Sequence, residues 1–380
     1  MTGIAILGST GSIGRQALEV LAAHADRFEV LGLAARRGSD ELLAQAYAHP
    51  GARIWCATGR PESIESGRWA DGGLEELATA DGVEIALVAT TGMAALPAVL
   101  AALADGRRVA LANKETLVTG GHLVAAALDA AGGDALDRLR PVDSEHSAIW
   151  QCLLGERIDD VRRLVLTASG GPFRDRAPHE LGPVTPEEAL AHPTWRMGPK
   201  ITIDSATLVN KAFEAIEARW LYRLPYSRID AVIHPRSIVH SLVEFVDGSY
   251  KAQLGVPDMR LPIQYALTHP ARLPSPARSE APEAWGALEF LPLGQDRYPA
   301  YRAVRRAAEA GGNRGTILNA ADEVAVEGFL RGAIGFARIA EVIDAAVERW
   351  GSDIEPGLPE IVALDREVRT TLAAELGTAA

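Results

Sequence analysis

Apolar residues cluster along the chain in short blocks whose spacing alternates between strand and helix periods. The blocks at 4–7, 28–35, 83–89 and 108–112 are nearly continuous apolar runs, as expected of strands buried on both faces. Residues 93–103 lie between two of these runs and have helical spacing. Because strands and helices alternate, the first part of the chain is predicted to be a doubly wound α/β domain with a parallel sheet.

A second sheet is predicted further along. One strand is expected at 164–167, and others at 230–245 and 249–254. The last two segments are joined at Asp247-Gly248, a hairpin turn signal.

The final part of the chain predicts a linker and a helical domain. Residues 268–285 are rich in proline, alanine, arginine and serine, as linkers on a protein surface often are. Apolar residues have helical spacing again at 300–310, 317–330 and 339–350. No further cluster of candidate catalytic or binding residues appears there, so this helical domain is expected to have a mainly structural role.

A glycine-rich turn follows the first apolar run and leads into a helix, with the sequence Gly8-Ser9-Thr10-Gly11-Ser12-Ile13-Gly14. Glycines there let the backbone approach a pyrophosphate that faces the helix N-terminus, as in dinucleotide-binding crossovers. The spacing is GxxGxxG rather than the commoner GxGxxG, so a merely structural turn remains an alternative.

The second strand ends at Arg36-Arg37, where NAD-binding proteins usually place an acid for the ribose hydroxyls. Arginines suit a 2′-phosphate, so NADP is favoured over NAD. The alternative is a pair of solvated surface arginines.

The segment 192–200 has the residues of a lid. Its prolines interrupt regular structure, Gly198 permits unusual backbone angles, and Trp195 and Met197 could close over a ligand.

The helix after the lid has two stripes. The apolar stripe is Val209, Ala212, Phe213, Ile216 and Trp220, and the polar stripe is Thr207, Asn210, Lys211 and Glu214. Asp204 or Ser205 is expected to cap this helix, whose first turn, with Asn210 and Lys211, would favour a phosphate. The alternative is a solvated face with a Lys-Glu pair.

Carboxylates point to a metal. In extended backbone, Asp143 and Glu145 would face the same way and could share one hard cation. Oxygen ligands favour magnesium or manganese over zinc. Such a pair is abundant in solvated loops, so it needs a third ligand, for which Glu214 is the candidate.

Two polar turns follow predicted strands. Asn113-Lys114-Glu115 stands at a carboxyl edge, where ligands bind in open parallel sheets, and Lys114 would sit beside a nicotinamide. Ser169-Gly170-Gly171 offers N–H groups and a hydroxyl to an anion. Each could instead be an ordinary loop.

Composition excludes several classes of protein. The formal charge of −12 over 380 residues disfavours nucleic acid or an anionic membrane as main partner, so any phosphate site must be local. The two cysteines, Cys56 and Cys152, are expected to be buried free thiols. The N-terminus has neither a basic region nor a long apolar run, so a cytoplasmic protein is expected.

Longer motifs, in the same order along essentially the whole chain, resemble 1-deoxy-D-xylulose 5-phosphate reductoisomerase. They are the glycine-rich turn, 111–115, 141–147, 169–173, the lid and its helix, 233–241, 254–260 and 318–323. The resemblance implies rearrangement of 1-deoxy-D-xylulose 5-phosphate and reduction to 2-C-methyl-D-erythritol 4-phosphate by NADPH with Mg²⁺ or Mn²⁺. It also implies a homodimer.

The resemblance implies four segments and a set of roles. The segments are a Rossmann-like NADPH domain at 1–134, an α+β catalytic and dimerisation domain at 135–267, a linker at 268–289 and a helical domain at 290–380.

The implied cofactor contacts are Thr10, Gly11, Ser12, Ile13, Arg36, Arg37, Asn113, Glu115 and Gly198. The implied substrate contacts are Lys114, Ser144, Glu145, Ser169, His192, Ser205, Asn210, Lys211 and Glu214. The implied metal ligands are Asp143, Glu145 and Glu214, and the implied catalytic residues are Lys114, Glu145 and His192.

His240 also matches a family histidine near the site. The chain departs from the family pattern at Ala35-Arg36-Arg37-Gly38, where a small residue, a polar or basic one and then Asn are frequent, and at Asp322, where Asn is common.

Two alternatives belong to other classes of protein. One is another NADP-dependent enzyme, such as a homoserine or aspartate-semialdehyde dehydrogenase. The other is a catalytically silent NADPH-binding regulator, in which the carboxylates would have no reason to persist. Metal-dependent NADPH turnover distinguishes these hypotheses.

Overall fold

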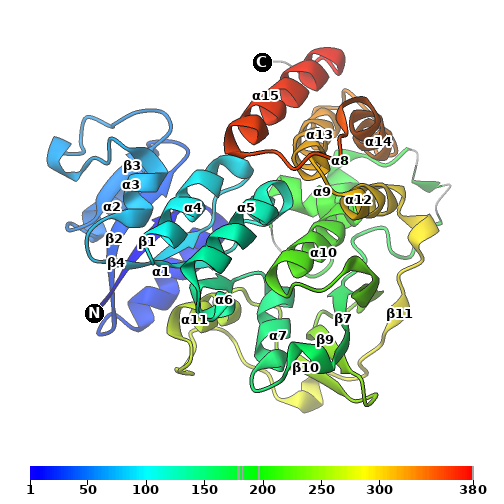
Figure 1. Cartoon of the computed structure of the whole chain (residues 1–380), viewed down its shortest axis with the longest axis horizontal. Coiled ribbons are helices and arrows are strands. Elements are labelled where there is room, and N and C mark those ends of the chain that lie inside the picture. Colours follow the sequence, from blue (N-terminus) through cyan, green and yellow to red (C-terminus); the bar gives the residue numbers. More distant parts are fainter. Residues whose placement is uncertain (178–179, 182, 196, 379–380) are drawn as a thin grey trace. The chain divides into compact units, whose positions relative to one another are not determined.

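The computed structural model describes residues 1–177, 180, 181, 183–195 and 197–378, and of Gln295 the backbone alone. The chain forms two compact units (Figure 1). Unit 1 comprises Met1–Thr116, Leu123–Trp150 and Asp258–Ser279, and unit 2 comprises Leu117–His122, Gln151–Pro257 and Glu280–Ala380. The division into four segments that the resemblance implies stays a prediction.

Unit 1 is built on a six-stranded parallel sheet of order β3-β2-β1-β4-β5-β6. Its strands are β1 (Thr2–Leu7), β2 (Phe28–Ala35), β3 (Arg53–Cys56), β4 (Val83–Val88), β5 (Arg108–Leu111) and β6 (Leu139–Pro141). The strand order reverses between β1 and β4, which is the switch point where open α/β sheets bind ligands. The predicted doubly wound domain is confirmed.

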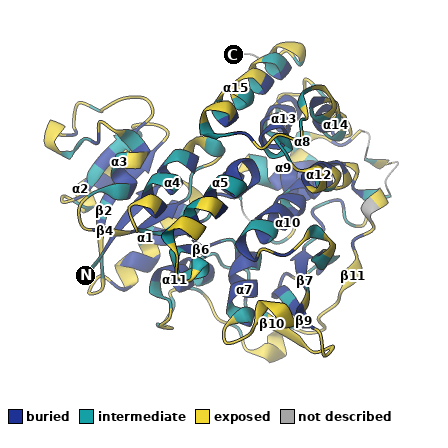
Figure 2. Ribbon diagram, viewed as in Figure 1, coloured by how far each residue is buried: buried dark blue, intermediate teal, exposed yellow. Residues whose placement is uncertain are grey.

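Helices cover this sheet because its central strands β1 and β4 are apolar on both faces. These strands are largely buried (Figure 2), and Ile4, Ile6, Leu33 and Leu87 are fully buried. Helix α1 packs against α11, and α3 packs against α4. The bounds are α1 (Ser12–Ala23), α2 (Asp40–Ala48), η1 (Ser66–Arg68), α3 (Gly73–Thr79), η2 (Met93–Ala95), α4 (Leu96–Ala104) and α11 (Arg260–Thr268). Helices α5 (Glu115–Ala131), α6 (Ala135–Arg138) and α7 (Ser144–Leu153) follow β5 and β6 along the chain.

Unit 2 contains a five-stranded mixed sheet of order β10-β9-β7-β8-β11. Its strands are β7 (Val161–Ala168), β8 (Ile229–Ile233), β9 (Val239–Phe245), β10 (Tyr250–Leu254) and β11 (Leu291–Pro292). The hairpin prediction is confirmed, because β9 and β10 are antiparallel and Gly248 has a φ of 85° between them. The strand expected over 230–245 is wrong, because this stretch forms two strands, β8 and β9.

The helices of unit 2 share one apolar core with part of the sheet. The longer ones are α9 (Pro199–Thr207), α10 (Val209–Leu221), α12 (Pro299–Ala310), α13 (Arg314–Leu330), α14 (Arg338–Trp350) and α15 (Leu358–Glu375). The short ones are η3 (Ile158–Asp160), α8 (Pro186–Leu190), η5 (Tyr226–Arg228), η6 (Pro282–Ala284) and η7 (Gln295–Arg297). The three predicted C-terminal helices are confirmed, and α15 is an addition. Among the described residues, no helix is long and apolar enough to span a bilayer.

Candidate active site

The glycine-rich turn of unit 1 fits a phosphate-bearing cofactor. A methyl group on Gly8, whose φ is 101°, would lie 2.5 Å from the carbonyl oxygen of Ala89, and one on Gly14 would lie 2.3 Å from that of Gly8. Glycine is therefore required at both positions. Gly11 caps α1 without a side-chain hydrogen bond, and Gly11 and Ser12 are exposed. The first turn of α1 thus offers N–H groups at the carboxyl edge of the sheet.

Arg36 and Arg37 lie beside this turn. The N–H groups of Gly8 and Ser9 both donate to the carbonyl of Ala34, at 2.9 and 2.8 Å, which joins the turn to the end of β2. Both arginines are exposed directly after that strand. Two cations next to the glycine turn suit the 2′-phosphate of NADP better than two free ribose hydroxyls.

Asn113 has a structural task that the sequence did not reveal. Its amide donates to the carbonyls of Thr90 and Gly92 and to the Glu115 carboxylate, each at 2.9 Å, and its oxygen accepts from the Thr116 N–H at 2.9 Å. The side chain is almost fully buried. Asn113 therefore ties the start of α5 to the loop after β4.

Asp143 and Glu145 do not lie in extended backbone. Helix α7 begins at Ser144, and Asp143 accepts the N–H of Glu145 at 3.2 Å, so the expectation of two carboxylates alternating along a strand is wrong. The competing principle is helix capping by a short acid. The Lys114 ammonium lies 3.1 Å from Asp143, and the Ser144 hydroxyl donates to Glu145 at 2.8 Å.

His192 is the centre of a polar cluster in unit 2. Its Nδ1 accepts the backbone N–H groups of Thr194 and Trp195 at 3.1 and 2.8 Å. Its Nε2 lies 3.1 Å from the hydroxyls of both Ser169 and Ser205. Burial lowers the pKa of His192 to about 4. The ring is therefore neutral near pH 7, and with Nδ1 as acceptor its proton is on Nε2.

The Ser169 turn follows β7 and contains two glycines with left-handed backbone. Gly170 and Gly171 have φ values of 85° and 69°, and the Gly171 N–H reaches the Ser169 hydroxyl at 3.3 Å. A methyl group on Gly171 would lie 2.6 Å from the carbonyl oxygen of Ser205. The turn therefore packs directly against α9.

The expected helix cap is wrong. Asp204 and Ser205 lie inside α9, whose cap is Gly198. A single residue, Leu208, joins α9 to α10 with a left-handed φ of 58°. The stretch predicted as one helix is two: α9 begins before the expected cap, in the segment taken as lid, and the helix that carries Asn210 begins only after Leu208. Arg196, in the lid, lies outside the described residues.

The Lys-Glu pair of the polar stripe lies on α10 and is buried, so the solvated-face alternative is wrong; Asn210 beside it is half-buried, and Thr207 belongs to α9. Lys211 and Glu214 are 4% and 1% exposed and form an ion pair, and the Asn210 amide donates to Glu214 at 2.6 Å. Glu214 is thus held in place by charge-assisted hydrogen bonds from an ammonium and an amide. His240 is also buried, on β9.

Sequence reasoning passed over Lys200. Its ammonium lies 2.6 Å from Asp204 and 2.7 Å from Asp322. The spacing of four between Lys200 and Asp204 was a signal, whereas the partner on α13 is far away in sequence.

Neither cysteine takes part in this chemistry. Both are buried free thiols, as predicted, and burial raises the pKa of Cys152 to about 11. The Cys152 thiolate is therefore disfavoured.

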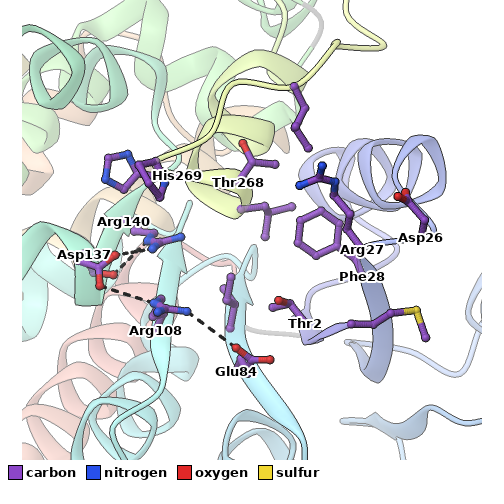
Figure 3. Close-up of a pocket in the computed structure, with 15 residues that line it drawn as sticks. Thr2, Asp26, Arg27, Phe28, Glu84, Arg108, Asp137, Arg140, Thr268 and His269 are labelled. Carbon is purple, nitrogen blue, oxygen red and sulfur yellow. Dashed lines mark hydrogen bonds and ion pairs between the residues drawn. The ribbon is translucent and has the colours of Figure 1, made fainter.

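A cavity of about 670 Å³ lies elsewhere, at the amino ends of the strands of unit 1 (Figure 3). Arg108 reaches both Glu84 and Asp137 there, at 4.0 and 3.6 Å, and Arg140 also pairs with Asp137. Because its charges neutralise one another and the glycine turn is at the opposite edge of the sheet, this cavity is separate from the candidate site.

The parallel sheet with its glycine turn, and a second unit with a polar cluster, define a dinucleotide-dependent oxidoreductase. The sequence-family model of 1-deoxy-D-xylulose 5-phosphate reductoisomerase matches residues 4–121 of this chain. Two further family models, both of C-terminal domains of the same enzyme, match residues 139–222 and 254–371. The chain belongs to the 1-deoxy-D-xylulose 5-phosphate reductoisomerase family.

Individual relatives match from end to end. The reductoisomerase of Thermomicrobium roseum is 47% identical over 99% of this chain and 98% of its own length, and that of Pelotomaculum thermopropionicum is 45% identical over 97% of each. A crystal structure of DOX-P reductoisomerase with NADPH, fosmidomycin and magnesium has a TM-score of 0.90, with 35% identity over 99% of this chain and 98% of that one. The Zymomonas mobilis enzyme with NADPH has a TM-score of 0.88, with 36% identity over 100% of both chains.

Proposed function

We propose that the chain converts 1-deoxy-D-xylulose 5-phosphate to 2-C-methyl-D-erythritol 4-phosphate, using NADPH and a divalent cation, in non-mevalonate isoprenoid precursor biosynthesis. The observation that carries this proposal is the match of reductoisomerases at 45–47% identity along almost the entire chain. The enzyme is an NADP-dependent oxidoreductase.

The divalent cation, Mg²⁺ or Mn²⁺, is assigned to Asp143, Glu145 and Glu214. Two of these carboxylates pair with a lysine ammonium, Asp143 with Lys114 and Glu214 with Lys211, so both lie where positive charge is bound. All three residues offer oxygen ligands, which a hard cation prefers. A solved relative contains magnesium. When bound, the cation supplies Lewis-acid polarisation of the substrate carbonyl and stabilisation of the oxyanion.

Substrate phosphate is assigned to Ser169, His192, Ser205, Asn210 and Lys211. The neutral His192 ring donates only from Nε2, so it orients one serine hydroxyl while the other stays available to a phosphate oxygen. Lys211 adds the positive charge. Holding this unreactive end fixes the reacting carbons.

The catalytic roles are assigned to Lys114, Glu145 and His192, with Ser144 touching the sugar. Lys114 is nearly buried, so its ammonium is a directed donor to developing negative charge. Trp195 and Met197 of the lid would exclude water while the aldehyde intermediate awaits hydride.

NADPH is assigned to the glycine turn through Thr10, Gly11, Ser12 and Ile13. Arg36 and Arg37 would bind the 2′-phosphate, and Asn113, Glu115 and Gly198 complete the assignment. The close approaches at Gly8 and Gly14 fit a backbone shaped for a pyrophosphate.

We also propose a cytoplasmic homodimer that pairs through the sheet of unit 2. Strand β10 is an edge strand; Tyr250 within it is 50% exposed, and Val246 in the turn before it is 65% exposed. Light scattering would give twice the chain mass, and fractionation of the native host would place the enzyme in the cytoplasm; a monomer mass or secretion would reject the respective proposal.

The test is NADPH oxidation by purified, chelated protein with 1-deoxy-D-xylulose 5-phosphate, with and without Mg²⁺ or Mn²⁺. Oxidation that requires both substrate and metal supports the proposal. Turnover of a different substrate would favour another dehydrogenase, and NADPH binding without any turnover would favour a regulator.

A further inference from the structure

Lys200, at the end of the lid, contacts both acidic and aromatic side chains. Its ammonium lies 2.6 Å from an Asp204 oxygen, 2.7 Å from an Asp322 oxygen and 5.1 Å from the centre of the Phe213 ring. The two carboxylates are 2% and 0% exposed, whereas the lysine side chain is 26% exposed. The lysine thus bridges from the surface into the core.

These contacts join three helices of unit 2. Lys200 and Asp204 lie on α9, Phe213 on α10 and Asp322 on α13. Phe213 directly precedes Glu214, and Asp204 directly precedes Ser205. Each partner of the ammonium on α9 and α10 is therefore adjacent in sequence to a residue assigned to ligand binding.

The charges in this cluster do not cancel if both acids are ionised. Burial raises the pKa of Asp322, while Lys200 and hydrogen bonding to Asp204 oppose that rise, and Glu323 adds to it. The Lys200 ammonium, 2.7 Å from Asp322, is therefore the contact that offsets the burial of this carboxyl group.

We propose that Lys200 and Asp322 are positioning residues for the phosphate site, an inference that rests on the proposed function for the identity of that phosphate. Asp322 holds Lys200 in the first turn of α9, and Lys200 holds Asp204 one turn later. This fixes the rotation of α9 about its axis, and with it the direction of the Ser205 hydroxyl toward His192.

A merely structural ion pair would affect stability without affecting ligand binding. Arg369 provides the matched control: its side chain is 28% exposed, and its guanidinium pairs with two carboxylates, Glu323 at 2.8 Å and Asp365 at 2.7 Å. It lies on α15, and its partners are on α13 and α15. Its environment is like that of Lys200, but none of these contacts involves α9.

The experiment compares Lys200→Met, Asp322→Ala, Asp322→Asn and Arg369→Met in the full-length enzyme. For each we would measure Tm, KM and kcat with 1-deoxy-D-xylulose 5-phosphate, Kd for NADPH, and Kd for inorganic phosphate by calorimetry. Lys200→Met and Asp322→Ala should raise KM and the phosphate Kd about tenfold, through misdirection of Ser205, with an unchanged NADPH Kd. Asp322→Asn should stay close to the wild type, because the amide oxygen of Asn can accept the same hydrogen bond from the Lys200 ammonium.

Arg369→Met should lower Tm by a similar amount and leave both constants unchanged. The proposal is overturned if Arg369→Met weakens phosphate binding as much as Lys200→Met does, or if Asp322→Ala binds phosphate normally. If Lys200→Met does not fold, the two Asp322 variants decide. Failure of the proposed function would appear separately, as absence of turnover in the wild type, while the phosphate measurement would still test the positioning role.

Discussion

The imidazole Nε2 of His192 lies 3.1 Å from the Ser205 hydroxyl, while Nδ1 is occupied by two backbone N–H groups of the lid. Two tasks are thus combined in one ring: one edge shapes the lid and the other orients a hydroxyl of α9. Protonation would put a second N–H on Nδ1, where two donors already point, and would therefore disrupt the lid.

Acid should destabilise the protein partly through His192. Its pKa is lowered from 6.5 to about 4, so the unfolded state binds more protons between these values and stability falls as the pH falls through that window. His192→Gln removes the titrating group and keeps an N–H donor. Urea unfolding at pH 7 and pH 5 should show a smaller acid-induced loss in the variant than in the wild type; equal losses would refute the neutral-ring assignment.

Removal of the Glu214 carboxylate should abolish activity without unfolding the protein. Glu214→Gln keeps the shape and a hydrogen bond from Asn210, but loses the charge assigned to the metal. Metal-dependent NADPH oxidation should fall by about a thousandfold or more, with an unchanged circular dichroism spectrum.

The control for this variant is Glu244→Gln, another buried carboxylate, which pairs with Arg162 and Arg163 on the sheet of unit 2. It should retain turnover. Near-normal activity of Glu214→Gln would contradict the ligand assignment.

A methyl group at Gly14 should weaken NADPH binding. Gly14→Ala would place a carbon 2.3 Å from the Gly8 carbonyl oxygen, so the turn must shift and its N–H groups must turn away from a pyrophosphate. Fluorescence titration should show an increase in the NADPH Kd of about tenfold or more. Gly51→Ala, where nothing lies within 4 Å, should bind NADPH like the wild type. Equal affinities in all three proteins would remove the turn from the cofactor site.

The arginines after β2 should determine the cofactor preference. Substitution of Arg36 and Arg37 by Gln should raise the KM for NADPH about tenfold and leave the KM for NADH unchanged, because only NADPH carries the 2′-phosphate. NADH serves as the internal control in steady-state assays. A parallel change for both cofactors would point to general damage of the loop instead.

Local sequence patterns predicted those strands and turns whose structure depends on residues close to them in the sequence. The strands β1, β2 and β4 were found because each is a buried apolar run, and the hairpin was found because Gly248 is needed at its turn. Strand β3 was missed because it has only four residues, of alternating burial. Helix α15 was missed because its buried residues are sparse.

In the candidate site too, features set by local sequence were predicted and features set by tertiary packing were not. His192 and Ser205 were assigned from their motif, whereas the helix start at Asp143 and the burial of Lys211 depend on packing that no short pattern encodes. The contact between Lys200 and Asp322 depends on α13 packing against α9, so it could not be predicted from either segment alone.

Leu208 limits how this region can change during evolution. Because only one left-handed residue joins α9 to α10, the connection is too short to accommodate an inserted or deleted residue without rotating one helix relative to the other. One inserted residue would turn the α10 face that carries Asn210, Lys211 and Glu214 by about 100° relative to Ser205. We therefore expect no insertions or deletions at Leu208 even in distantly related sequences, whereas the surface loops can vary in length.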